Sequence, residues 1–367
     1  MAAGIAAALL TGAAPALAFE TVPGPGADPA CMAPWSADTA FHRFPARQGP
    51  FRIALANGYD ANSWRAQMLK TAKAYAAQPG VAAKLKEFRL VSTGEKVDAQ
   101  IAAVNGFINA GFDAIVIDAE NPKAFAPVMA RAKQAGVVLV AFDNTIDSQD
   151  VINVNVDQTE IGALSARWLI SRLPKGGKVL EVRGVQGTSV DADRHAGASA
   201  TLAASGVKWQ VTEAVGKWDD AVARQATADA IAAHGPFDGI ISQAGDAGVV
   251  QALIAAKHPF VPMSGETENG FRKLCAQHAE EGLQCSSAGT GPAQVAVALK
   301  VAIAALEGQV IPQAIKLPTS AIAYPDFKEG RDYYQDQPDG FFVGNAFPTC
   351  GISFTAEEIA GQTKADQ

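Results

Sequence analysis

Short apolar runs alternate with longer segments of helical periodicity along most of this chain. The apolar runs have the length of buried strands, and the segments between them repeat apolar residues at the spacing of a helix face. The predicted strands are 51–56, 88–92, 113–117, 137–142, 178–183, 207–211, 237–242, 260–263 and 283–287. The predicted helices include 64–77, 97–109, 124–135, 158–173, 190–204, 219–234 and 292–306. Strands and helices in alternation predict parallel sheets with helices on both faces.

The length of the chain fits two such sheets. No helix is predicted before the apolar segment 151–156, so we expect the chain to leave the first lobe just after it. The predicted first lobe comprises 51–157 with 289–318, and the second comprises 158–288 with 319–350. The prediction is an α/β fold of two doubly wound parallel-sheet lobes joined by a multi-strand hinge.

Three further segments lie outside these lobes. Residues 1–18 hold an apolar stretch followed by Ala16, Leu17 and Ala18, a small-x-small cleavage pattern that predicts a signal peptide and export. No Lys or Arg precedes that stretch, so we expect a start further upstream or a shortened signal. Residues 19–50 are rich in Pro, Gly and Ala and are expected to form an extended arm, and 351–367 form a C-terminal tail.

The net charge narrows the possible partners. The formal charge of −7 belongs to the part after residue 18, because the first eighteen residues carry no charged side chain. An acidic chain is a poor partner for nucleic acid, so we expect none.

The four cysteines fit an oxidising compartment, and their even number allows complete pairing. Three connectivities are possible. Pairing Cys275 with Cys285 closes a short helix-to-strand loop and leaves Cys31 for Cys350, which is the pairing we predict. A zinc site is the competing idea, but no two cysteines have C-x₂₋₄-C spacing.

A polar and aromatic loop follows the first predicted strand. Asn62, Trp64 and Arg65 lie between that strand and a helix, which places them at the carboxyl edge of the sheet, where α/β proteins bind ligands. A tryptophan face suits the C–H side of a sugar ring, and the amide and guanidinium suit its hydroxyls. The alternative is an ordinary loop with a half-buried tryptophan.

Carboxylates follow several other strands directly. Asp118, Asp143 and Asp246 would meet at the sheet edges, where they could accept hydrogen bonds from hydroxyls while Arg65 and Arg194 donate them. The competing interpretation is that each aspartate caps the helix after it. For Arg194 the alternative is a solvated helix face, and for Trp218 it is packing under a loop.

These segments together resemble the periplasmic sugar-binding proteins of ABC transporters, of the ribose- and galactofuranose-binding type. The resemblance covers roughly residues 50 to 325, and the order and spacing of the matching segments make it specific. The matching segments are 53–64, 114–118, 138–143, 179–189 with Arg194, and 240–246 with Gly265 and Glu266. The resemblance implies the type I periplasmic binding protein fold, a periplasmic location, a carbohydrate ligand and a membrane permease as partner.

The resemblance also implies roles for single residues. Asn62 and Trp64 match a ligand-binding Asn and a stacking Phe of the ribose type, whereas Arg65 is similar to an Arg of the galactofuranose type. Asp118, Asp143, Arg194, Trp218 and Glu266 match ligand positions, and Asn144 stands where the ribose type has Arg. Gly245 and Gly289 stand where the ribose type has Asn and Gln, and these departures argue against ribose itself.

The sequence offers little for an enzyme. It contains no G-x-x-x-x-G-K-[ST] phosphate loop and no G-x-S-x-G elbow, and its five histidines are scattered. Strand-end aspartates could serve a glycosidase, which sequence spacing does not test. We predict a monomeric, cofactor-free binding protein that closes on a sugar or polyol and delivers it to a permease. Alternatives are a periplasmic sugar sensor that presents its closed form to a chemoreceptor or kinase, and a repressor effector domain.

Overall fold

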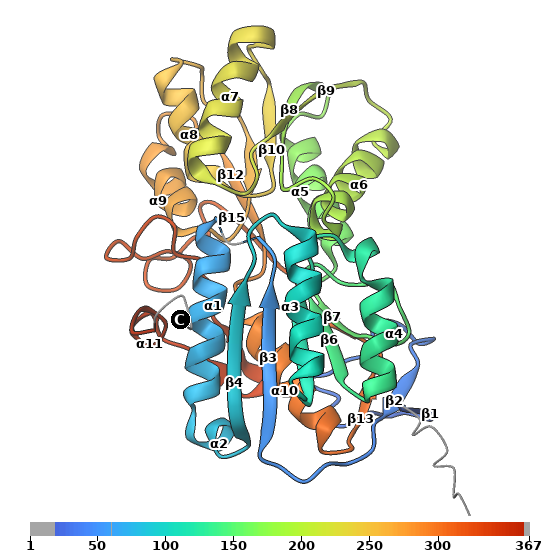
Figure 1. Ribbon diagram of the computed structural model, residues 1–367. Helices are drawn as coiled ribbons and strands as arrows, with labels where there is room; N and C mark the ends of the chain where they lie inside the picture. Colours follow the sequence, from blue (N-terminus) through green and yellow to red (C-terminus); the bar gives the residue numbers. More distant parts are fainter. Residues whose placement is uncertain (1–18, 60, 363–367) are drawn as a thin grey trace, which may run out of the picture.

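A computed structural model describes residues 19–59 and 61–362 of the chain. The predicted signal peptide lies outside these residues. The described part forms two lobes, each built on a six-stranded sheet (Figure 1). The prediction of two doubly wound lobes is confirmed.

The sheet of the first lobe is parallel throughout, in the order β14-β7-β6-β5-β3-β4. Its strands are β3 (Phe51–Asn57), β4 (Leu85–Ser92), β5 (Ala114–Asp118), β6 (Val138–Phe142), β7 (Ile152–Asn155) and β14 (Ala314–Lys316). Successive side chains of a strand point to opposite faces. Accordingly Ile53 and Leu55 join one apolar core, and Ala54 and Ala56 join another.

Helices cover both faces of this sheet (Figure 1). They are α1 (Ser63–Ala77), α3 (Val97–Asn109), α4 (Ala126–Ala135) and α10 (Gln294–Leu306), with the short α2 (Pro79–Ala82) and the 3₁₀ turn η1 (Pro122–Phe125). Helices α1 and α10 share one core, and α3 and α4 share the other. Buried residues line every side of α10, as expected for a helix without a polar face.

The second lobe has the sheet order β15-β12-β11-β10-β8-β9, in which only the edge strand β15 is antiparallel to its neighbour. Its strands are β8 (Gly177–Arg183), β9 (Trp209–Val215), β10 (Gly239–Ser242), β11 (Met263–Gly265), β12 (Cys285–Gly289) and β15 (Ser320–Ala323). Its helices are α5 (Gln158–Arg172), α6 (Ser189–Ala204), α7 (Asp220–His234), α8 (Asp246–Ala255) and α9 (Asn269–His278).

Helices α8 and α9 were not among the helices predicted from periodicity, although a helix after Asp246 and a helix at Cys275 were expected. Seven of the ten residues of α8 are buried, so the helix has no regular polar face to produce a helical period. It also contains Gly248, whose backbone packs closely against Asp220. Packing decides the local structure here against the weak helix propensity of glycine.

The segments beyond the two sheets pack on the first lobe. Strands β1 (Glu20–Val22) and β2 (Phe41–Arg43) form a small sheet with β13 (Val310–Pro312). At the other end, β16 (Ala346–Phe347), η2 (Pro348–Cys350), β17 (Ile352–Ser353) and α11 (Ala356–Ala360) lie beside α1 (Figure 1). Residues 346–350, assigned to the second lobe from sequence, therefore pack against the first, because Phe347 and Cys350 are buried in the core that α1 and α10 share.

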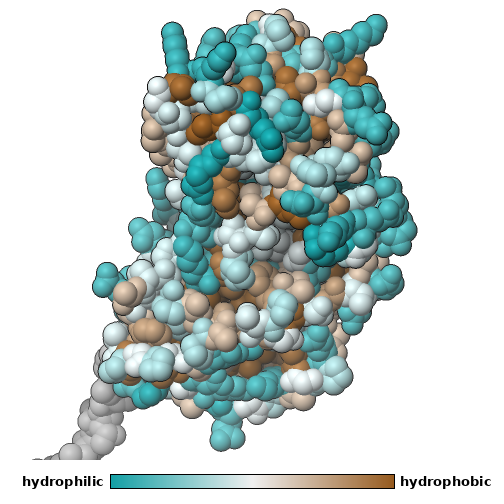
Figure 2. All heavy atoms as spheres, turned by 180° about the vertical axis from the view of Figure 1, so that it is seen from behind, coloured by the Kyte–Doolittle hydropathy of each residue, from teal (hydrophilic) through white to brown (hydrophobic). Residues whose placement is uncertain are grey.

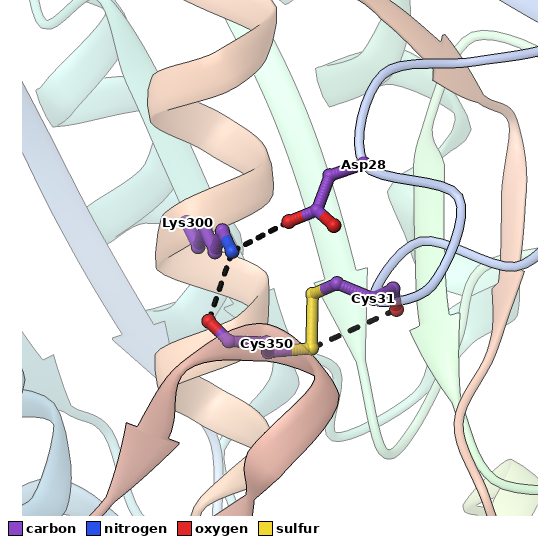
Figure 3. Close-up of a disulfide and its surroundings, with 4 residues drawn as sticks. All are labelled: Asp28, Cys31, Lys300 and Cys350. Atoms are coloured by element: carbon purple, nitrogen blue, oxygen red, sulfur yellow. Dashed lines mark hydrogen bonds and ion pairs between the residues drawn. A yellow bond between two sulfur atoms is a disulfide. The ribbon is translucent and has the colours of Figure 1, made fainter.

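Two disulfides are formed, and they are the pairs expected from the sequence. Cys275 of α9 is bonded to Cys285 of β12. Cys31 in the N-terminal arm is bonded to Cys350, 319 residues away (Figure 3). Beside this second disulfide, Lys300 of α10 donates to the Asp28 carboxylate at 2.7 Å and to the Cys350 carbonyl oxygen at 2.9 Å. Asp28 in the N-terminal arm and Cys350 are thus both bonded to α10.

On the face of the molecule that Figure 2 shows, hydrophilic and hydrophobic side chains are mixed. Within residues 19–59 and 61–362, no helix combines the length and the apolar character needed to cross a membrane.

Candidate functional site

A cavity lies between the two lobes. Both lobes and the segments that connect them line this cavity. Most of the lining residues lie at the carboxyl ends of strands or in the first turns of helices. Seven of the ten residues expected at the site line this cavity, namely Asn62, Trp64, Arg65, Asp143, Arg194, Trp218 and Glu266. The other lining residues are Val190, Gln243, Ala244, Thr290 and Phe342.

Arg65 is the cationic centre of the first-lobe half. Its guanidinium is buried, forms an ion pair with Asp118, lies 3.6 Å from Asp143 Oδ2 and donates to Asn57 Oδ1 at 3.0 Å. Burial lowers the pKa of Arg65, and the Asp143 carboxylate opposes that shift. Asn62 accepts the Arg65 backbone N–H at 2.8 Å as the N-cap of α1, which leaves the Asn62 amide nitrogen for a ligand.

Asp143 lies where the two lobes meet. Its backbone has a φ of 56°, a conformation that non-glycine residues seldom adopt. Oδ1 accepts from Gln294 Nε2 at 2.9 Å, and Gln158 Nε2 lies 3.5 Å away. Because Gln158 begins α5 and Gln294 begins α10, this carboxylate contacts two of the segments that connect the lobes.

Arg194 is the cationic centre of the second-lobe half. Nε donates to Gln158 Oε1 at 2.8 Å, Nη1 to the Gln243 carbonyl oxygen at 2.8 Å and Nη2 to Glu266 Oε1 at 3.0 Å. The α6 backbone at Arg194 packs directly on Gly162 of α5, where a side chain would collide with the Arg194 carbonyl. The guanidinium is therefore held in one orientation at the cavity wall.

The Glu266 carboxylate occupies the space beside Gly289. A Cβ at Gly289 would collide with the Glu266 carboxylate, so the missing side chain provides the space that Glu266 fills. Glu266 Oε2 also accepts the Thr267 hydroxyl at 2.9 Å and its backbone N–H at 2.5 Å. The longer acid is thus fixed toward the cavity.

Two tryptophans line the cavity from opposite lobes. Trp64 is partly exposed, and its Nε1 donates to the Thr290 carbonyl oxygen at 3.3 Å. Trp218 is 8% exposed and belongs to a small apolar cluster with Tyr59 and Val190. Its indole lies on Gly184, where any side chain would collide with the ring.

Three of the expected site residues lie behind the cavity wall instead of on it. Asp118 is fully buried and holds Arg65, and Asn144 donates to Asp118 Oδ1 at 3.1 Å. Asp246 is also fully buried, and its Oδ2 accepts the Glu266 backbone N–H at 2.6 Å. These residues position side chains that line the cavity.

The two lobes touch directly around the cavity. Asn144 Oδ1 accepts the backbone N–H of Val190 at 3.1 Å, and the Tyr59 hydroxyl donates to the Lys217 carbonyl oxygen at 3.2 Å. Lys217 also forms an ion pair with Glu95 at 3.0 Å. The lobes are therefore in a closed arrangement.

A group of buried carboxyls lies under the second-lobe wall. Burial raises the pKa of Asp246 to about 7, and it raises the pKa of Glu268 well above its usual range. Burial also raises the pKa of Asp220, which shares a hydrogen bond with Glu268. Glu268 Oε2 accepts the Asp246 backbone N–H at 2.9 Å. In the part of the chain that the structure describes, no group of three His, Cys, Asp or Glu residues is arranged to hold a metal ion.

Sequence reasoning missed five cavity residues, and two of them, Gln243 and Phe342, were missed for different reasons. Gln243 follows the predicted strand 237–242 directly, so its position carried a usable signal. Phe342 lies in a segment without strand or helix periodicity, and no pattern in the sequence pointed to it.

The comparisons with known proteins agree with this arrangement of lobes. Residues 53–309 match the family described as periplasmic binding protein domain. The chain belongs to this family. The predicted resemblance to sugar-binding members is confirmed by curated relatives. The D-ribose/D-allose-binding protein of Pseudomonas aeruginosa is 34% identical over 179 residues, which cover 46% of this chain and 54% of the relative.

Two further relatives show the same range of similarity. The galactofuranose-binding protein YtfQ of Escherichia coli is 30% identical over 153 residues, 40% of this chain and 46% of the relative. This periplasmic binding protein thus spans about half the length of the curated relatives it matches. An ABC transporter solute binding protein of Thermobispora bispora has the same fold, with a TM-score of 0.69 and 26% identity over 75% of this chain and 85% of its own.

Proposed function

We propose that this chain is an exported binding protein that captures a sugar or polyol between its lobes and delivers it to an ABC transporter permease. The observation that carries the proposal is the composition of the cavity wall. Two arginines face two carboxylates, Arg65 with Asp143 and Arg194 with Glu266, and Trp64 and Trp218 flank them. This set suits a neutral ring with many hydroxyls.

The charge of the wall supports a neutral ligand. The cations Arg65 and Arg194 are matched by the anions Asp143 and Glu266, so a charged ligand would leave one of them without its partner. Each carboxylate can accept hydroxyl protons while each guanidinium donates to hydroxyl oxygens. The rings of Trp64 and Trp218 would cover the apolar faces of the ligand.

The proposed mechanism is domain closure. An open form exposes one half-site on each lobe, and a ligand that contacts both halves lowers the free energy of the closed form. The direct contact between Asn144 and Val190 is then made only on closure. Names of curated relatives support the ligand class, since one is a ribose- and allose-binding protein and another a galactofuranose-binding protein.

A thermal-shift screen tests this function. The chain from residue 19 onward is heated with pentoses, hexoses, polyols and sugar acids, and with amino acids for comparison. A ligand that binds only the native state at about 100 times its Kd adds about 2.7 kcal/mol of stability. At least one carbohydrate should raise the melting temperature in proportion to the logarithm of its concentration. A shift with amino acids and none with any carbohydrate would overturn the proposal.

A further inference from the structure

One wall of the cavity comes from outside the family match. Phe342 lines the cavity and is 1% exposed, although the matched region ends at residue 309. The ring belongs to residues 338–344, which we call the wall segment. This segment passes between the two lobes before the chain packs on α1.

The wall segment is bonded to the second lobe through its backbone. Glu268 and Phe342 form an antiparallel bridge, and the Val343 N–H donates to the Thr267 carbonyl oxygen at 3.0 Å. The Asn269 N–H donates to the Phe341 carbonyl oxygen at 2.8 Å. These bonds form an isolated bridge between the wall segment and residues 267–269, which directly follow Glu266, the cavity acid.

A single side chain bonds the wall segment to the first lobe. Gln67 of α1 accepts the Phe342 N–H at 2.8 Å and donates to the Phe342 carbonyl oxygen at 2.9 Å. Gln67 is buried and lies two residues after Arg65 on the same helix. Both backbone groups of Phe342 are therefore held by a residue of the helix that carries the first-lobe half-site.

The wall segment is also closely packed at its carboxyl end. Gly344 has a φ of 91°, and its carbonyl oxygen packs so closely on Gly291 that a side chain there would collide with it. Beyond Gly344 the chain is anchored to the first lobe through the disulfide of Cys350 (Figure 3). The position of the Phe342 ring is thus determined from both sides.

We propose that Phe342 is a specificity-determining residue that forms the end wall of the cavity and restricts the ligand to the size of a single sugar ring. This inference rests on the proposed sugar-binding function. The ring adds a third aromatic face beside Trp64 and Trp218, and its backbone is held by Gln67 and by the second lobe. A longer ligand would have to displace the ring from the cavity.

The test compares three variants by isothermal titration. Phe342→Ala removes the ring, Phe342→Leu keeps an apolar side chain, and Phe341→Leu changes a phenylalanine of the same segment that does not line the cavity. The probes are D-ribose, D-allose, D-xylose, D-galactose, xylitol and myo-inositol, together with the disaccharides maltose and cellobiose. Melting temperatures of the three variants show whether each remains folded.

We expect Phe342→Ala to weaken binding of the best single-ring probe by at least about tenfold, the ratio that corresponds to about 1.4 kcal/mol. The ratio of disaccharide to single-ring Kd should fall in that variant. Phe342→Leu should weaken binding less, and Phe341→Leu should bind as the unchanged protein does. If Phe342→Ala does not fold, the comparison of Phe342→Leu with Phe341→Leu decides.

Three results would overturn the inference, and they are distinguishable. Equal affinity and equal size selection in the unchanged protein and both Phe342 variants would reject the end wall and leave the sugar-binding function intact. An equal loss in Phe341→Leu and Phe342→Leu would do the same, because the effect would then belong to the segment and not to the ring. Failure of the unchanged protein to bind any probe would reject both proposals.

Discussion

Asn144 of the first lobe accepts a hydrogen bond from the backbone N–H of Val190 in the second lobe at 3.1 Å. The amide nitrogen of the same side chain donates to Asp118 Oδ1 at 3.1 Å. Asp118 in turn holds Arg65 at the cavity wall. One buried amide therefore joins the contact between the lobes to the first-lobe half-site.

Replacing Asn144 by Ala should weaken ligand binding because it removes a contact that we assign to the closed form. The loss of one intramolecular hydrogen bond corresponds to about 0.5–1.5 kcal/mol, or about two- to tenfold in Kd. Small-angle scattering should also show a more open ligand-free form. Asn109→Ala, on the exposed end of α3, is the control and should leave both measurements unchanged. An unaltered affinity in Asn144→Ala would show that this contact does not contribute to ligand binding.

The arginine and carboxylate on opposite lobes should each be needed for affinity. Asp143→Ala leaves Gln294 Nε2 without its 2.9 Å acceptor, and Arg194→Ala leaves Glu266 without its cation. Each orphaned buried partner costs about 1–3 kcal/mol. Calorimetry with the sugar found in the screen should show that loss in both variants. If both bind as tightly as the unchanged protein, the two residues have a structural role only.

Tryptophan fluorescence should report ligand binding through two residues. Trp64 and Trp218 line the cavity, whereas Trp35, Trp168 and Trp209 do not. The ligand-induced change should shrink in Trp64→Phe and again when Trp218→Phe is added. Gly184→Ala should also reduce it, because a methyl group there collides with the Trp218 indole. A change that persists in the double variant would mean that the ligand binds elsewhere.

The buried carboxyl of Asp246 should make stability fall as the pH rises. Burial raises its pKa from 3.8 to about 7. Between these two pKa values the folded state keeps a proton that the unfolded state has lost. The contribution of Asp246 to the free energy of unfolding is therefore complete below pH 4 and disappears as the pH approaches 7. The slope is at most about 1.4 kcal/mol per pH unit.

Asp246→Asn isolates this effect, because asparagine can still accept the Glu266 N–H that Asp246 accepts at 2.6 Å. Urea unfolding between pH 4 and pH 8 should show the variant gaining stability relative to the unchanged protein as the pH rises. Asp229→Asn, on the exposed face of α7, serves as the control. A stability difference that is constant across this range would show that Asp246 ionises normally.

The sequence predicted the lobes because their strands are short, apolar and regularly spaced. It also predicted seven cavity residues, since strand ends meet at one sheet edge and Asp143 and Trp64 lie just beyond such ends. It placed Asp246 at the cavity as well, but α8 begins at that residue and turns its carboxylate under the Glu266 backbone. Only the packing of α8 decides whether the Asp246 carboxylate lies in the cavity or behind its wall.

The wall segment had no sequence signal for a different reason. Its residues form no regular element, and they are held by single side chains from distant positions, such as Gln67. Asn269 fixes the preceding loop by donating to the Tyr334, Gln337 and Pro338 carbonyl oxygens. Contacts of this kind join residues far apart in sequence and leave no period along the chain.

A crystal structure with the sugar or polyol that gives the largest thermal shift tests the central claim most directly. The account predicts a closed molecule with one ligand between Trp64 and Trp218 and with ligand hydroxyls within hydrogen-bonding distance of Arg65, Asp143, Arg194 and Glu266. A ligand bound outside this cavity, or a ligand held by one lobe alone in an open molecule, would contradict it.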